Sequence, residues 1–512
     1  MMAGLVFLVH QQNAQKSKMA MADVGTAATG QTFFDPMGIS KNDDLNVNSF
    51  AFTSGSHSTT GSHSTSKALN SSIAEKAPKQ APELYGQRWV QLIYLSLFAM
   101  ISDWICFSVA SVPQSWETSF GHDPAELIDL FLFTNVFTCF FFTDVARVLG
   151  LKRVITGAGA LMCAGAFLRS GVPFSGSLPS YEMIQAGTVL VGAAQPFFQC
   201  TPPLLSATWF GSQERALSTA TAINFNQVGI AAAFIVGGPM GQDYGGLVSY
   251  FGIISVFTLL VCIGAFLQFE ERPPTPPSAS AAAKLEEEAN EDRSISLTFP
   301  GKAADLLSQK GFRVPLVGFV ASIGVTNIIS TFTDSSLRRA GFLDITEIEL
   351  SGAAFQFAIV LGGILIGGYV DKTKRFKRTT MLCLNISGIL LTVLSLAFGN
   401  DLQLPDWAVL VALLGVGATL GPVQPINAEL AVETTYPSDE NAIEAVQQLC
   451  GNLFSALLVP LCGYAAMYDL DFLGKADFRG DSILLLCLLL GTSFYYATFD
   501  SPLKRLEADE AE

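Results

Sequence analysis

Three side-chain amides lie in the middle of an apolar segment of the chain. The stretch LSATWFGSQERALSTATAINFNQVGIAAAF passes from one apolar run through a short polar loop into a second run, which carries Asn224, Asn226 and Gln227. An amide in a hydrocarbon layer needs a hydrogen-bond partner or a function, because an unsatisfied polar group is costly there. On a helix, Gln227 lies about one turn beyond Asn224, whereas Asn226 points elsewhere. We expect these amides to face a cavity between two helix bundles, with Gln227 the first to test.

A carboxylate in another apolar run poses the same question. Asp103 lies beside Trp104 in the first long apolar run. An unpaired carboxylate within a membrane is costly, so Asp103 would supply a counter-charge for a cationic substrate or carry a proton in a relay. The alternative is that it pairs with a neighbouring helix or bonds to its own backbone. Adjacent residues point about 100° apart on a helix, so Asp103 and Trp104 need not share a face.

The composition indicates an integral membrane protein. The chain has 512 residues, of which 50% are hydrophobic and 14% charged, and its mean hydropathy is +0.41. Soluble domains carry roughly a quarter charged residues. The net charge of −15 is spread over tails, linker and loops, so there is no basic surface for a nucleic acid. Lipid offers no partner to backbone groups, so the spanning segments must be helices.

Twelve apolar runs recur along the chain, each near the length of about 20 residues that crosses a hydrocarbon core. The first six are Trp89–Val112, Leu127–Asp144, Arg153–Arg169, Tyr181–Trp209, Ala216–Met240 and Leu247–Gln268. The second six are Phe312–Ser335, Leu350–Val370, Thr379–Phe398, Trp407–Val432, Ala442–Tyr468 and Ser482–Phe499. This spacing predicts twelve transmembrane helices in two sets of six.

Polar segments divide the chain into five parts. Residues 1–87 repeat a Gly-Ser-His-Ser-Thr unit and have the composition of a disordered tail. Residues 88–269 form the first six-helix bundle, 270–311 a linker rich in Pro, Ala and Glu, 312–500 the second bundle, and 501–512 a short tail.

Basic residues indicate the orientation. They concentrate in the loops after the second and eighth runs and at the C-terminus. The positive-inside rule puts these loops in the cytoplasm, which makes both termini cytoplasmic. Four basic residues on the other side fit less well, namely Arg338, Arg339, Lys475 and Arg479.

The sequence contains no enzyme motif. It has no glycine-rich phosphate loop with a lysine, and its histidines are not paired with carboxylates at the spacing of a metal site. We therefore expect no cofactor and no bound metal, and a transporter driven by gradients rather than by ATP hydrolysis. A receptor that keeps a transporter fold without transporting is the alternative of another class. The glycine-rich stretch from Gly362 to Gly368 favours the transporter, because a static receptor would not need such helix segments for gating.

Two loops carry a recognisable motif. After the eighth run, GGYVDKTKRFKR places Gly367 and Asp371 ahead of a basic cluster that includes Arg375. After the second run, TDVARVLGLKR places Asp144 ahead of Arg153 in a weaker copy. This resembles the loop motif of the major facilitator superfamily, in which the aspartate and basic residues lock a helix interface on the cytoplasmic side. The resemblance implies an all-α membrane protein of twelve helices in two bundles that rock about a midplane site.

Further motifs resemble a smaller family. AQPFFQCTPPLLSATWFGSQE and STATAINFNQVG, then AELAVETTYP and DWICFSV, are similar in order and spacing to the feline leukemia virus subgroup C receptor-related transporters. The resemblance covers about residues 88–503 and implies transport of choline, ethanolamine or haem by alternating access. Glu429 and Glu433, within AELAVETTYP, lie one turn apart and are expected to hold the inner gate closed.

The resemblance also implies a substrate cage. In that family, a tryptophan of helix one, a tyrosine of helix seven and glutamines of helices five and eleven surround the substrate. The tryptophan corresponds here to Trp104, and the glutamines correspond to Gln227 and Gln448. An aromatic face suits a quaternary ammonium, which cannot donate a hydrogen bond. Asn327 stands where the tyrosine is expected, and a shorter segment before helix eleven leaves open whether Gln447 or Gln448 faces the cavity.

Haem remains an alternative substrate, although the sequence offers it no histidine in the pathway. All four histidines, His10, His57, His63 and His122, lie outside the predicted spans, which argues against axial histidine ligation. The expected partners are a small organic solute, either an organic amine or haem, and the lipid bilayer. We expect the protein to be a monomer and to lie in the plasma membrane.

Overall fold

The computed structural model describes most of the chain. The described residues are 84–172, 176–211, 214–277, 281, 298–398, 404–472 and 476–511. Almost all of the predicted tail and much of the predicted linker therefore lie outside the described residues, as do His10, His57 and His63.

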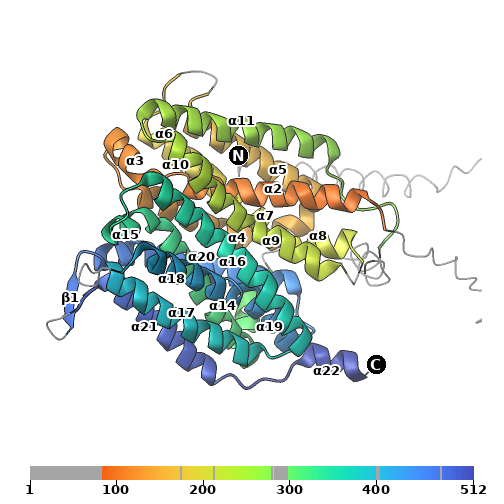
Figure 1. Cartoon of the computed structure of the whole chain (residues 1–512). Coiled ribbons are helices and arrows are strands. Elements are labelled where there is room, and N and C mark those ends of the chain that lie inside the picture. Colours follow the sequence, from red (N-terminus) through yellow and green to blue (C-terminus); the bar gives the residue numbers. More distant parts are fainter. Residues whose placement is uncertain are drawn as a thin grey trace, which may run out of the picture. The chain divides into compact units, whose positions relative to one another are not determined.

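The first half of the chain folds into one group of packed helices (Figure 1). Its elements are α2 (Gln87–Phe107), α3 (Pro113–Phe120), α4 (Pro124–Leu149), α5 (Leu151–Ser170), α6 (Tyr181–Ala194), α7 (Pro196–Gln199), α8 (Pro202–Trp209), α9 (Arg215–Ala232), the π-helix η1 (Ala233–Gly237), α10 (Gly238–Met240) and α11 (Tyr244–Gln268).

The second half repeats the plan and adds a hairpin. Its elements are α13 (Phe299–Ser308), α14 (Lys310–Thr331), α15 (Thr333–Arg339), α16 (Ile345–Thr373), α17 (Phe376–Phe398), α18 (Asp406–Leu420), α19 (Val423–Thr435), α20 (Glu440–Ala465), β1 (Asp469–Phe472), β2 (Ala476–Arg479), α21 (Gly480–Ala497) and α22 (Lys504–Ala511). The two strands pair antiparallel, with Asp469 opposite Arg479.

Eleven helical segments within the described residues are long and apolar enough to cross a membrane. The predicted run Tyr181–Trp209 is not among them, because it is broken into α6, α7 and α8. Pro196 and Pro202 stand at the first positions of α7 and α8, where the missing N–H interrupts the helical ladder. The prediction of an all-α membrane protein is confirmed, and the small hairpin β1–β2 is an addition to it.

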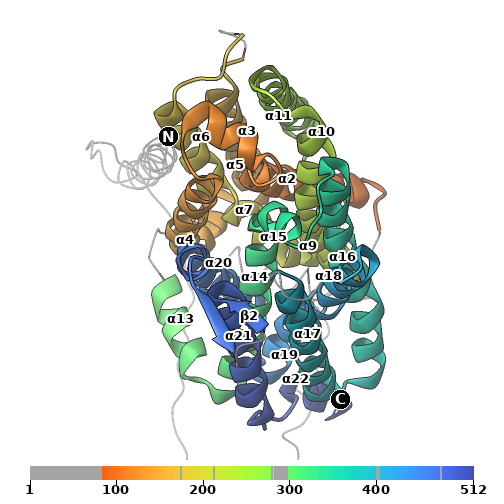
Figure 2. The same cartoon turned by 60° about the vertical axis from the view of Figure 1, so that its left-hand side comes forward.

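The two halves lie against each other along two helix pairs. In Figure 1 the orange to yellow-green helices of the first half lie above the green to blue helices of the second. Between the halves, α4 packs on α20, and α9 packs on α16. The linker helix α13 contacts both α4 and α20, and Figure 2 shows it below α4. We call the end of the bundle with α13 and α22 the α13 end, and the opposite end, with α3 and α15, the α3 end.

Small residues allow the closest helix contacts, as is usual between membrane helices. Gly229 of α9 lies directly against the backbone of α2, and a Cβ at this position would overlap the carbonyl oxygen of Met100. The contact between α2 and α9 therefore depends on the absence of a side chain at Gly229.

We expect Gly229→Ala to lower the melting temperature of the purified protein by several degrees. The added methyl group must push α9 away from α2, which costs on the order of 1–3 kcal/mol as overpacking does elsewhere. Gly368→Ala on α16 is the matched control, because no atom lies within 4 Å of its added Cβ. Equal melting temperatures for the two variants would contradict the packing argument.

Candidate functional site

A chain of buried amides runs from the first half of the molecule to the second. Gln195 donates from Nε2 to Oδ1 of Asp103 at 2.6 Å. Asn135 donates to Oε1 of Gln195, and Asn452 donates to Oδ1 of Asn135 at 2.9 Å. Because Asn452 belongs to α20 and the other three belong to α2, α4 and the α6–α7 break, the chain joins the two halves.

The break in the α6–α7–α8 segment provides two members of this chain. Gln195 is the residue between α6 and α7, immediately before Pro196. Gln199 ends α7, and its Oε1 accepts from Asn135 at 3.3 Å and from Asn452 at 3.2 Å. Gln199 is half-buried and the other members of the chain are buried, where polar groups are stable only when they are paired.

One face of α20 extends the chain with two more polar residues. Glu444, Gln448 and Asn452 are spaced four apart, so they lie along one face of the helix. All three are buried, and Gln448 donates to Oε1 of Glu444 at 2.9 Å. The neighbouring Gln447 is turned to α19 and donates to the carbonyl of Asn427 at 3.2 Å. Gln448, not Gln447, therefore shares a face with the residue that reaches the first half.

Trp104 packs inside the first half. Its indole N–H donates to the hydroxyl of Tyr250 on α11 at 3.0 Å, and its ring lies 6.0 Å from that of Phe257. The adjacent Asp103 is turned instead to Gln195. The two neighbours therefore contact different helices, as the angle of about 100° between successive residues allows.

The other predicted cage residues lie on the helices that were expected. Gln227 is half-buried on α9, and Asn226 has a buried Oδ1 that receives no hydrogen bond. Asn224 faces α16, since a Cβ at Gly363 would lie 3.8 Å from its Oδ1. Asn327 of α14 donates to Oγ of Ser455 at 3.1 Å.

No hydrogen bond within the described residues joins Trp104, Gln227, Gln448 and Asn327 to one another. The cage that the resemblance implies therefore stays a prediction. The amides that do meet are Gln195, Asn135, Gln199 and Asn452, which we did not single out from the sequence. Asn135 and Asn452 lie within predicted apolar runs, so the criterion that selected Asn224 would have found them too.

The loop aspartate of the first half holds the linker helix. Asp144 accepts from the backbone N–H of Thr298 at 3.2 Å and from its hydroxyl at 2.8 Å. Thr298 is the residue immediately before α13. Arg147 lies 3.6 Å from the same carboxylate, whereas Arg153 is exposed.

The predicted gate residues of the second half lie near the C-terminal helix. Glu433 is buried, and its Oε2 accepts from the backbone N–H of Leu506 in α22 at 3.2 Å. Glu429 is half-buried one turn earlier. Two ion pairs complete the α13 end: Lys302 with Asp439 at 2.8 Å, and Arg505 with Glu440 at 3.4 Å.

The remaining residues of the loop motif are less engaged. Gly367 lies within α16 with open space beside it, and Arg375 is exposed. The side chain of Asp371 lies outside the described part of the structure.

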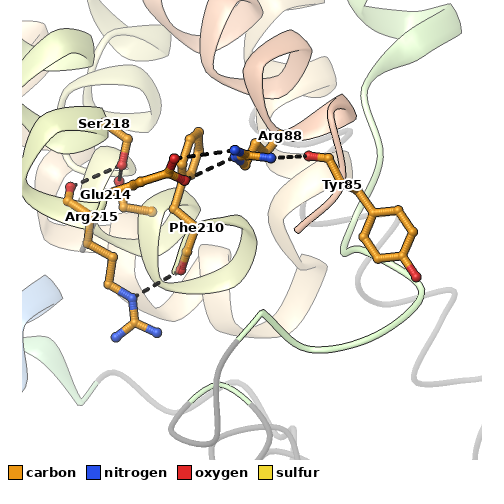
Figure 3. A network of polar contacts seen from close by, with 7 residues as sticks. Tyr85, Arg88, Phe210, Glu214, Arg215 and Ser218 are labelled. Atoms are coloured by element: carbon orange, nitrogen blue, oxygen red, sulfur yellow. Dashed lines mark hydrogen bonds and ion pairs between the residues drawn. The ribbon is translucent and has the colours of Figure 1, made fainter. Parts of the chain in front are cut away.

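An ion pair fixes the turn between α8 and α9 to the start of α2 (Figure 3). Arg88 contacts Glu214 through Nε at 3.1 Å and Nη2 at 3.3 Å, and its guanidinium lies 5.9 Å from the ring of Phe210. Arg215 donates to the carbonyl of Phe210 at 3.3 Å. This end of α2 is therefore tied to the segment that follows the broken helix.

Comparison with known proteins identifies the family. The profile of the Major Facilitator Superfamily matches residues 93–459. The chain belongs to this superfamily. The solved structure of a D-xylose-proton symporter covers 81% of the chain and 98% of its own length with a TM-score of 0.60, at 13% identity. That likeness concerns the fold.

Two curated relatives cover most of their own length. The solute carrier family 49 member 4 homolog of Xenopus tropicalis is 27% identical over 408 residues, which is 74% of this chain and 86% of the relative. The choline/ethanolamine transporter flvcr2a of Danio rerio is 25% identical over 451 residues, which is 85% of this chain and 91% of the relative. Both the superfamily and the resemblance to the smaller transporter family are confirmed.

We expect Asn452→Ala to destabilise the contact between the halves. The change removes the donor to Asn135 and Gln199 and leaves their oxygens short of a partner in a buried place, at a cost of about 1–3 kcal/mol. Thermal melting of the purified protein measures the effect. Asn385→Ala is the control, because Asn385 is exposed and bonds only to its own helix. A melting temperature equal to that of the control would refute the role of the amide chain.

Proposed function

We propose that this member of the superfamily moves a small organic amine of the choline and ethanolamine class across the plasma membrane. The two halves rock about the buried amide chain, so that the site opens first at one end and then at the other. The basic loops assign the α13 end to the cytoplasm and the α3 end to the outside. The named activity of the Danio rerio relative supports this substrate class.

The observation that carries the proposal is the buried carboxylate of Asp103. It lies at one end of the amide chain, is 6% exposed, and forms no ion pair with a cationic side chain among the described residues. A carboxylate in a membrane interior is stabilised by a counter-charge, which a cationic substrate can supply. The nearby indole of Trp104 offers an aromatic face for the same cation once the halves move.

Haem is the second candidate substrate, and the described residues favour it less. The one histidine that they include, His122, is exposed, stacks on Tyr181 at 3.8 Å and contacts Glu126 at 3.1 Å. It lies at the α3 end rather than along the amide chain. Within the described residues, haem would therefore be held by its ring and propionates, or by a Cys, Met or Tyr side chain in place of a histidine.

Uptake of labelled choline and ethanolamine by cells that express the protein tests the proposal. We expect both to accumulate above the level of cells with the empty vector, and excess unlabelled choline to compete. If neither accumulates while surface labelling shows the protein at the plasma membrane, the amine proposal fails. A receptor that does not transport would bind choline without accumulating it, which separates that alternative.

Substitutions at two residues test the predicted cage within the same assay. We expect Trp104→Ala and Gln227→Ala each to reduce choline uptake at least about tenfold, the equivalent of about 1.4 kcal/mol. Trp104→Phe keeps an aromatic face without the N–H that Tyr250 accepts, so it should retain more uptake if the face binds the cation. Trp407→Ala, at a residue 68% exposed, is the control. Normal uptake by Trp104→Ala would rule out the cage even if transport stands.

A further inference from the structure

A pocket of about 580 Å³ lies between the two halves at the α3 end. Its walls come from α3 and the segment before α11 in the first half, and from α15 and α16 in the second. The polar residues that matter among its lining are Ser111, Gln114, Asp243, Asp334, Arg338 and Glu349. None of these residues belongs to the amide chain or to the α13 end.

Glu349 is the unusual member of this lining. It is 4% exposed, and its Oε2 is buried without any hydrogen bond. Its carboxyl group packs against Gly238 of α10, where an added Cβ would lie 2.6 Å from Oε2. Because Glu349 belongs to the second half and Gly238 to the first, the unsatisfied oxygen lies at the junction of the halves.

The other charged groups around the pocket are already engaged. Arg338 donates from Nε to both carboxylate oxygens of Asp334, at 3.0 and 2.9 Å. Asp243 accepts from the backbone N–H of Gly246 at 2.8 Å and caps α11. With three carboxylates and one guanidinium in its lining, the pocket is negative. Glu349 is the carboxylate with an oxygen left over.

The pocket borders the surroundings of Trp104. A Cβ at Gly237, next to Gly238, would overlap the hydroxyls of Ser111 and Tyr250. Ser111 lines the pocket, and Tyr250 accepts the N–H of Trp104. The backbone of Gly237 and Gly238 therefore separates Glu349 from the residues that surround the predicted aromatic cage.

The chemistry of this lining fits an organic cation better than a metal ion. The described residues contain no group of three or more His, Cys, Asp or Glu side chains that could hold a metal. Calcium needs six to eight oxygen ligands, so one free carboxylate oxygen is too few. The volume lies in the range of small-molecule sites, roughly 300–1,000 Å³. An ammonium group can stabilise a carboxylate that keeps one buried oxygen without a hydrogen bond.

We propose that this pocket binds the ammonium group of a small organic amine, with Glu349 as its counter-ion, before the amine reaches the amide chain. The substrate class rests on the proposed function, whereas the binding site rests on the pocket and on Glu349. The site is an entry site, so it sets how tightly the amine is captured and not how fast the loaded protein turns over.

Thermal melting of the purified full-length protein tests the binding directly. Tetramethylammonium chloride is compared with sodium chloride at the same concentration. We expect tetramethylammonium to raise the melting temperature of the wild type by about 2 °C or more at saturation, because it binds the folded state. Glu349→Gln should lose this shift. Glu347→Gln, an exposed carboxylate on the same helix outside the pocket lining, should keep it.

A second variant changes the surroundings of the Glu349 carboxylate through a residue of the first half. Gly238→Ala pushes against Glu349 without changing any charge, so it should reduce the tetramethylammonium shift as well. An equal shift in the wild type and in Glu349→Gln, or in the wild type and Gly238→Ala, overturns the proposal. Absence of a shift in the wild type also overturns it, because the pocket then does not bind the ammonium group.

Choline uptake separates this inference from the proposed function. Glu349→Gln should raise the KM for choline about tenfold with little change in the maximal rate, because only ground-state capture is lost. If choline is not transported but the tetramethylammonium shift depends on Glu349, the entry site stands and the proposed function fails. If transport depends on Trp104 but the tetramethylammonium shift does not depend on Glu349, the proposed function stands and the entry site fails.

Discussion

The structure depends on one constraint: a polar side chain in an apolar interior must find a partner there. Asn135 and Asn452 meet this constraint by bonding to each other across the two halves. Arg169 meets it within the first half, where its guanidinium donates to the hydroxyls of Thr188 and Ser108. Contacts of the first kind join the two halves, so any relative movement that separates Asn135 from Asn452 would have to break them.

The two ends of the molecule are built from different interactions. At the α13 end, surface ion pairs and hydrogen bonds attach α13 and α22 to the bundle. Each exposed pair is worth little alone, typically below about 1 kcal/mol, so the closure there is a sum of weak contacts. The α3 end has a hollow instead, with a negative lining. The α13 end is therefore joined by many weak contacts, whereas the α3 end has an open space between the halves.

The sequence predicted the long elements well, because a run of about 20 apolar residues has few other uses. Helix geometry also allowed Asp103 and Trp104 to contact different helices, because successive residues point about 100° apart. The sequence could not predict that Gln195 would meet Asp103, because that contact needs the break at Pro196 and the packing of α2 against it. Partners on different helices follow from tertiary packing, which the spacing of residues along one helix does not contain.

The π-helix η1 changes how the residues beyond it should be counted. An ordinary helix turns 100° per residue, and a π-turn contains one residue more than an α-turn does. The face of α10 is therefore offset by about one position from the face that α9 would present if it continued unbroken. Gly238, which comes directly after the π-helix, is the residue that packs against the carboxyl group of Glu349. Removing one residue from this helix would shift the register of Gly238, and any larger side chain brought to its place would meet the carboxyl group of Glu349.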